Sequence, residues 1–152
     1  VMNIDINFDD EKNLDHLSAS CDRVKALAKT MGNVTIVRKG VVDIISNGIN
    51  VVTCDAKGSD RRCGGQGDVL AGTIGVFANW AHNKLAKANK TYKKELGEPT
   101  MIDAAFGGCY LTRVCSRKAF EIHKRAMMPV DLIAQIGPSF EALEKAITET
   151  RL

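Results

Sequence analysis

The segment 58–72, GSDRRCGGQGDVLAG, constrains the fold of this chain more than any other. It holds five glycines and two arginines close to the acidic residue Asp68, and it leads directly into an apolar stretch. Glycine adopts backbone conformations closed to other residues and lets backbone amides approach a ligand closely. Residues 58–67 are therefore predicted to form a loop, and a helix is predicted from Asp68 to about Lys84.

Apolar residues recur at helical spacing in three other segments. Glycines inside two of the predicted helices indicate close packing or close approach at Gly72 and Gly75 and tight packing at the pair Gly107-Gly108, because an interior glycine costs about 1 kcal/mol relative to alanine. Residues 1–16 are acidic and polar and are predicted to be a loop or a ragged end. The helices with this spacing are expected at about 17–31, 101–123 and 130–147. Gly32 would cap the first of them, and Pro138 must kink or restart the last.

Short runs rich in β-branched residues follow the first helix. Residues 34–37 are expected to form a buried strand, and Lys39 and Gly40 end it. The runs 41–45 and 49–53 flank Ser46-Asn47-Gly48, and Asn-Gly between such runs is a strong hairpin signal. A buried strand followed by a hairpin is therefore predicted.

The expected elements are a helix, a strand, a hairpin, the glycine loop and three helices. This is an α/β pattern, but it holds too few strands for a self-sufficient sheet. The 152 residues are thus expected to be the C-terminal part of a larger α/β domain. The lysine-rich residues 84–99 are expected to form a surface insertion loop.

Charge and cysteine content exclude several classes of protein. A net charge of +3 is too small for generic nucleic-acid binding, and no apolar run is long enough to cross a membrane. The five cysteines are odd in number and show no CxxC spacing, which favours reduced thiols over a zinc site or disulfides. A cytoplasmic location is expected, or a mitochondrial one if a targeting peptide precedes Val1.

The glycine loop has the composition of an anion site, although it matches neither the Walker A pattern nor the dinucleotide fingerprint. The backbone amides of Gly65, Gln66 and Gly67 are candidates for an anion hole, and the dipole of the following helix would reinforce it. An acid at this place would repel a phosphate, which suggests that it takes part in chemistry.

Two roles for Asp68 remain open from the residues themselves. Aspartate is a preferred N-cap, which stabilises a helix by about 1 kcal/mol. The other role is a general base that takes a proton from a substrate hydroxyl while its oxygen attacks phosphorus.

The neighbouring residues leave similar alternatives. Arg61 and Arg62 are surface charges or bidentate phosphate ligands, and Lys39 is a solvated lysine or a phosphate or ribose contact. Cys63 is expected to fill space rather than to act as a nucleophile, since no histidine lies near it in sequence. No chemistry is assigned to the histidines, His16, His82 and His123.

Three motifs resemble one known family. The order Lys39-Gly40-x-x-Asp43, Ser46-Asn47-Gly48 and GSDRRCGGQGD over 58–68 is similar to that of the NAD(P)H-hydrate dehydratases, members of the ribokinase-like superfamily. Residues 104–120 and 131–137 resemble the C-terminal helices of that family. The Arg61-Arg62-Cys63 motif and the insertion at 84–99 resemble the eukaryotic, ATP-using branch of that family. The resemblance spans roughly 32–145 and implies that residues 1–152 are the C-terminal portion of one ribokinase-like domain, a three-layer α/β/α sandwich.

The resemblance also implies an activity. It is the ATP-dependent conversion of (S)-NAD(P)HX, the hydrated cofactor, to NAD(P)H, with release of ADP and phosphate. The hydroxyl would be phosphorylated and phosphate then eliminated, with Mg²⁺ bridging the ATP phosphates. Asp68 is implied to face the hydrated nicotinamide, with Gly65 and Gly67 beside it as catalytic residues. The residues implied to contact ATP are Lys39, Gly40, Val41, Val42, Asp43, Gly58, Ser59, Asp60, Arg61, Arg62, Cys63, Gly64, Gly65, Gln66 and Gly67.

One departure from the family bears on the isolated chain. The Asn-x-x-Glu-Phe motif that helps to bind substrate in this family does not occur before the first helix. Part of the hydrate site is therefore expected to lie outside these residues, and the chain alone is expected to be inactive. The expected partners are ATP and hydrated NADH or NADPH, with no nucleic acid and no membrane, and homo-oligomerisation is left open. The alternatives are a ribokinase-like kinase acting on a hydroxymethyl-pyrimidine or thiazole, and a non-catalytic nucleotide-binding fragment.

Overall fold

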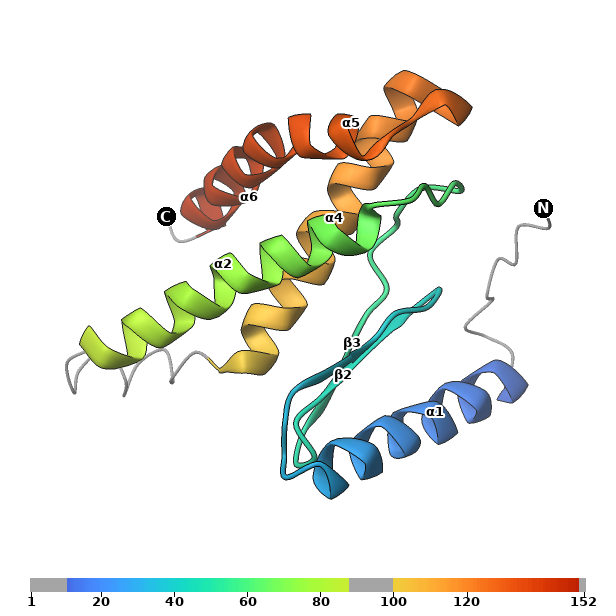
Figure 1. The fold of residues 1–152 in the computed structure, drawn as a ribbon, viewed down its shortest axis with the longest axis vertical. Coiled ribbons are helices and arrows are strands. Elements are labelled where there is room, and N and C mark those ends of the chain that lie inside the picture. The colour runs from blue at the N-terminus through green and yellow to red at the C-terminus, as the bar shows by residue number, and fades with distance from the viewer. Residues whose placement is uncertain (1–10, 88–99, 151–152) are drawn as a thin grey trace. The chain divides into compact units, whose positions relative to one another are not determined.

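A computed structural model of the chain describes residues 11–87 and 100–150. These residues belong to two compact units, which meet in sequence between Asp55 and Ala56. Within the described residues, strands occur in the first unit and helices in both (Figure 1). The predicted mixture of helices and strands is confirmed, and the three-layer sandwich stays a prediction.

The first unit consists of one helix followed by a small antiparallel sheet. Its elements are α1 (Glu11–Thr30), β1 (Ile36–Arg38), β2 (Asp43–Ser46) and β3 (Val51–Cys54). The strands pair in the order β1-β2-β3, so β2 is central. α1 packs against β2 and β1 (Figure 1), and its Val24 and Ala28 are buried.

Burial divides the three strands unequally. All four residues of β2 are buried, whereas β1 is half-buried or exposed along its length. The buried strand predicted at 34–37 is therefore wrong in its burial and lies slightly later, at Ile36–Arg38. The physical reason is that, among the described residues, β1 pairs only with β2 and so forms an edge of this sheet.

The hairpin predicted at Ser46-Asn47-Gly48 is confirmed. β2 and β3 pair up to Ser46 and Val51, and the Asn47 side-chain oxygen accepts the amides of Ile49 and Asn50 at 3.0 and 2.9 Å. Gly48 has φ +83°, and a Cβ there would lie 2.8 Å from the Lys29 amide nitrogen. Glycine is therefore needed both for the turn and for its contact with the end of α1.

α1 begins earlier than its apolar periodicity indicates. It starts at Glu11, so the loop predicted for 1–16 is wrong for 11–16, and residues 1–10 lie outside the described residues. Acidic residues favour the first turns of a helix, which explains why this acidic stretch is helical. Gly32, with φ +81°, ends α1 as predicted: its amide donates to Lys29 O, and the next amide donates to Ala28 O.

The second unit is helical beyond the glycine loop. Its elements are α2 (Gln66–Lys87), α4 (Met101–His123), the 3₁₀ turn η1 (Lys124–Ala126), α5 (Pro129–Ala134) and α6 (Ile136–Thr150). α2 extends to Lys87, so residues 84–87 are helical rather than part of a loop, and 88–99 lie outside the described residues. The predicted last helix is two helices separated at Gln135, with Pro138 in the first turn of α6, where no amide hydrogen is required.

α4 has the predicted bounds, and a capping box fixes its first residue. The Asp103 amide donates to Thr100 Oγ1 at 3.3 Å, and the Thr100 amide donates to Asp103 Oδ2 at 2.7 Å. These two bonds satisfy donors that a helix start otherwise leaves open.

α2 and α4 approach closely at the glycine pair of α4. A Cβ at Gly108 would lie 2.4 Å from Ile74 Cγ1 and 3.0 Å from the Ile74 backbone nitrogen, and one at Gly107 would contact the Phe77 ring at 3.6 Å. The tight packing predicted for this pair is confirmed. The same expectation is not met for Gly72 and Gly75, where a Cβ would meet nothing within 4 Å among the described residues.

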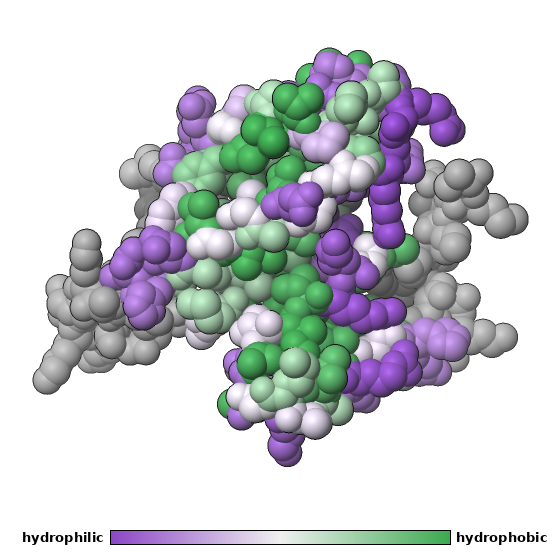
Figure 2. Space-filling view, viewed as in Figure 1, coloured by the Kyte–Doolittle hydropathy of each residue, from purple (hydrophilic) through white to green (hydrophobic). Residues whose placement is uncertain are grey.

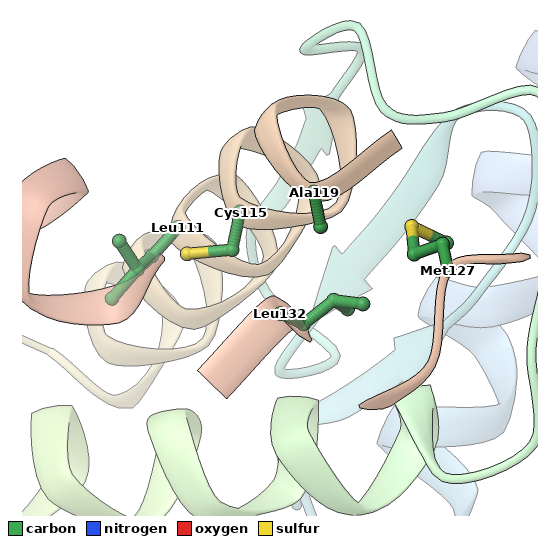
Figure 3. Packing of buried hydrophobic residues seen from close by; sticks show 5 residues of the cluster. All are labelled: Leu111, Cys115, Ala119, Met127 and Leu132. Carbon is green, nitrogen blue, oxygen red and sulfur yellow. The ribbon is translucent and has the colours of Figure 1, made fainter. Parts of the chain in front are cut away.

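A core cluster joins α4 to the segments that follow it. Figure 3 shows its members, which come from α4, from α5 and from the short connection between η1 and α5. They are Leu111, Cys115, Ala119, Met127 and Leu132, each at most 3% exposed. Burial raises the pKa of the Cys115 thiol, and the Cys115 side chain packs as a small apolar group. None of the helices in the described residues is both long enough and apolar enough to cross a membrane.

Gly108→Ala tests the approach of α2 to α4. We expect the free energy of unfolding to fall by about 1 to 3 kcal/mol, because the methyl group overlaps the Ile74 main chain. The control is Gly75→Ala, which adds its methyl group to open space and should leave stability unchanged or raise it by up to about 1 kcal/mol. Urea denaturation followed by circular dichroism measures both, and equal effects would contradict the close approach.

Candidate functional site

The glycine loop ends at Gly65, which fixes where α2 begins. Gly65 has φ +89°, and its carbonyl oxygen accepts the amides of Asp68 and Val69, each at 3.1 Å. A Cβ at this position would lie 2.7 Å from Pro129 Cγ at the start of α5. Glycine is therefore required both by backbone conformation and by the contact with Pro129.

Asp68 is the third residue of α2 and is not its N-cap. The helix starts at Gln66, so the capping role considered for Asp68 is wrong, as is the loop predicted for Gln66 and Gly67. The Asp68 side chain is exposed, and its carboxylate forms no hydrogen bond or ion pair with the described residues. A negatively charged side chain in the first turn of a helix is stabilised by the helix dipole.

Open amide hydrogens lie just before Asp68. In the part of the chain that the structure describes, the amides of Gly65 and Gly67 donate to no acceptor, and that of Gln66 makes one long bond of 3.5 Å to Cys63 O. Such amides at a helix N-terminus attract anions. The geometry is compatible with the anion hole predicted from the sequence.

A hollow of about 730 Å³ runs from this helix start along α2. It lies between α2, α5 and α6, and Figure 2 shows apolar side chains gathered over this region. Gly65 and Asp68 line one end, and Phe77, Trp80 and Phe140 line the other, with their ring centroids 5.5 to 6.3 Å apart. The carboxylate thus stands at the polar end of a largely apolar hollow.

The arginines and the cysteine of the loop are in different surroundings. Arg62 is exposed and Arg61 is half-buried, and neither guanidinium has an acidic partner among the described residues. Both can therefore receive an anion. Cys63 is half-buried and packs against the core cluster, which favours the space-filling role predicted for it.

Two residues of α4 that sequence reasoning missed hold the loop. Ser116 Oγ lies 2.6 Å from Ser59 Oγ and accepts a bond from the Gln66 side-chain nitrogen at 3.3 Å, and Arg113 donates to Ala56 O at 3.1 Å. Arg113 and Ser116 are three residues apart and so share one helix face. This spacing was the only sign of the pair in the sequence, and it does not indicate which segment the two side chains contact.

The other predicted ATP-contacting segment, 39–43, belongs to the first unit and connects β1 to β2. The Gly40 amide donates to Asp43 Oδ1 at 2.9 Å, and Asp43 is 5% exposed, so this carboxylate stabilises the turn. A Cβ at Gly40 would lie 2.8 Å from Val42 O. Lys39 and Val41 are exposed. This segment and the glycine loop lie in different units.

Comparison with known proteins places the chain in a family. A sequence model described as NAD(P)H-hydrate dehydratase matches residues 10–138. The chain belongs to the NAD(P)H-hydrate dehydratase family. It is similar to proteins named ATP-dependent (S)-NAD(P)H-hydrate dehydratase in Bos taurus (46% identity over 81% of this chain), Homo sapiens (47% over 79%) and Dictyostelium discoideum (44% over 77%). The matched part is 36%, 33% and 38% of those proteins, so the chain spans about a third of their length.

Gly65→Ala tests the start of α2. We expect the free energy of unfolding to fall by about 1 to 3 kcal/mol, because alanine disfavours φ +89° and its methyl group overlaps Pro129. Gly64→Ala is the matched control, since φ is not positive there and a Cβ meets nothing within 4 Å. Thermal unfolding of the two variants should differ clearly, and a Gly65→Ala protein as stable as Gly64→Ala would disprove the requirement.

Proposed function

We propose that this chain is the ATP-binding part of an ATP-dependent NAD(P)H-hydrate dehydratase. Its reaction would convert (S)-NADHX or (S)-NADPHX to NADH or NADPH and release ADP and phosphate. One observation carries the proposal beyond family membership. The carboxylate of Asp68 is unpaired among the described residues, one turn from open helix-start amides and at the end of a hollow.

The proposal includes the domain to which the chain belongs. We propose that residues 1–152 are the C-terminal portion of a single ribokinase-like domain with three α/β/α layers, and that 84–99 includes a surface insertion. The lengths of the relatives support this, because the chain corresponds to about a third of each. The small antiparallel sheet is compatible with it.

The mechanism follows from charge at the start of α2. The amides of Gly65 and Gly67, with the helix dipole, would hold the phosphoryl group of ATP. Asp68 would accept the proton of the substrate hydroxyl as that oxygen bonds to the γ-phosphorus, and the bond to the departing ADP would break. In the second step the C–O bond breaks and phosphate leaves, the neighbouring ring carbon loses a proton to water, and the nicotinamide ring double bond reforms. Phosphate is the better leaving group, which is why hydroxyl phosphorylation assists dehydration.

ATP contacts are proposed for the rest of the glycine loop and for 39–43. Arg61 and Arg62 would pair with phosphate oxygens through their planar forks. The turn closed by Gly40 and Asp43 would present backbone groups and Lys39 to the nucleotide, with the Asp43 carboxylate shaping the turn.

Mg²⁺ fits this arrangement as a companion of the nucleotide. The described residues form no cluster of three or more metal-ligating side chains. Mg²⁺ is usually held by one or two carboxylates, by substrate phosphates and by water, so no such cluster is needed. The exposed carboxylate of Asp60 in the glycine loop would be a protein ligand, which leaves Asp68 to act as the base, and the ion would neutralise charge on the phosphates.

The thiols agree with a reducing compartment such as the cytosol. The cysteines at positions 21, 54, 63, 109 and 115 are thiols and form no disulfides with one another. Disulfides are rare in the cytosol because thiols are kept reduced there.

Asp68→Asn tests the proposed base in the protein that carries this chain, at its full length. We expect the rate of ATP-dependent NADH formation from (S)-NADHX to fall by about 10²- to 10⁴-fold, because the amide cannot accept the proton. The dissociation constant for ATP should change little. Reduced-nicotinamide absorbance and ADP release measure the reaction, and equilibrium dialysis measures ATP binding.

Asp22→Asn is the matched control, since Asp22 is an exposed carboxylate on α1 outside the proposed site. Full activity of Asp68→Asn would show that Asp68 is not the base. A wild-type protein that accumulates a phosphorylated alcohol without forming NADH would identify a kinase instead.

A further inference from the structure

One buried hydroxyl connects α4 to both ends of the glycine loop. Ser116 Oγ lies 2.6 Å from Ser59 Oγ, and the Ser59 hydroxyl donates to Arg61 O. The Gln66 side-chain nitrogen donates to Ser116 Oγ at 3.3 Å and to Arg61 O at 3.4 Å. Because each hydroxyl has one hydrogen, the order is Gln66 to Ser116, Ser116 to Ser59, and Ser59 to Arg61 O.

This order closes a ring of hydrogen bonds on the Arg61 carbonyl. Ser116 is 7% exposed, so water competes little for the hydrogen bonds of its hydroxyl. Bonds in such a chain polarise and strengthen one another. The ring fixes the first residue of α2, Gln66, against the loop five residues before it.

Two further contacts bind the loop to the same helix. Arg113, one turn before Ser116, donates to Ala56 O at 3.1 Å, and its Cγ would lie 3.8 Å from a Cβ at Gly58. Cys63 packs against the cluster that includes residues of α4. The loop is thus held at its start, its middle and its end. The exposed Arg62 directly precedes Cys63, and Gly67, whose amide is open, directly follows Gln66.

We propose that Ser116 is a positioning residue: through Ser59 and Gln66 it holds the glycine loop in the conformation that binds the ATP phosphates. This inference rests on the proposed function, because it assigns the loop to ATP. Ser116 itself touches no reacting atom in this scheme. Its contribution is pre-organisation, which appears in ATP affinity because only molecules with a correctly placed loop bind.

Ser116→Ala in the full-length protein removes both of its bonds. We expect the KM and the dissociation constant for ATP to rise about tenfold, since the apparent affinity falls with the competent fraction, while the KM for the hydrate stays within about twofold. Limited trypsin cleavage after Arg61 and Arg62, measured by mass spectrometry, should accelerate about tenfold, because cleavage follows the population of the open loop.

The control separates positioning from general stability. Thr100→Ala removes the N-cap of the same helix and so lowers its stability, but the hydrogen bonds of Thr100 go to Asp103 and not to the loop. It should leave ATP affinity and cleavage at Arg61 and Arg62 as in the wild type. Equal changes in Ser116→Ala and Thr100→Ala would show a purely structural role and would overturn the proposal.

A second variant keeps the test decisive if Ser116→Ala does not fold. Gln66→Ala breaks the ring from α2 and should reproduce the loss of ATP affinity and the faster cleavage. If Ser116→Ala folds, the double variant should be no worse than the more affected single variant, because both changes break one ring. Additive effects, or a Gln66→Ala protein with wild-type ATP affinity and cleavage, would refute it.

Two failures remain distinguishable. A wild-type protein that binds no ATP refutes the proposed function and this inference together. A wild-type protein that dehydrates the hydrate with ATP, while Ser116→Ala keeps its ATP affinity, refutes this inference alone.

Discussion

The contact between Gly108 of α4 and the main chain of Ile74 in α2 sets the geometry of the second unit. A side chain larger than hydrogen at this point would push the helices apart, because its first carbon would lie only 3.0 Å from the Ile74 nitrogen. α4 then carries Arg113 and Ser116 to the loop that precedes α2. The distance between the helices thus controls whether the loop can reach its hydrogen-bond partners.

The position of Asp68 in the first turn has a chemical advantage over the N-cap position. An N-cap carboxylate uses its lone pairs on backbone amides of its own helix. Gly65 occupies the turn before α2 instead, through its carbonyl and its positive φ. The Asp68 carboxylate therefore stays open while it remains near the positive end of the helix.

Local signals in the sequence predicted much of this fold. Apolar residues at helical spacing predicted α4, and Asn47-Gly48 predicted the hairpin, because both signals act over a few residues. The glycine loop was likewise predictable from composition. The predictions that were wrong or missing concern features set by backbone groups or by residues far apart in the sequence.

The start of α2 at Gln66 was missed because the first turn is closed by the Gly65 carbonyl oxygen. A backbone group of this kind leaves no capping side chain in the sequence. The role of Ser116 was missed because a serine on a helix looks the same in sequence whether it faces water or a partner loop. Gly72 and Gly75 were expected to pack as Gly108 does, but glycine spacing does not say which face of a helix meets a neighbour.

The sequence separation of the loop contacts has a consequence for folding. In the first unit, α1 and the three strands are consecutive, and each strand pairs with the next along the chain. The bonds from Ser59 to Ser116 and from Arg113 to Ala56 each join residues 57 positions apart. Closing a long loop carries an entropic cost before such bonds can form, so the glycine loop should become ordered only after α4 has docked on α2. The start of α2 is then among the last features to form and among the first to open.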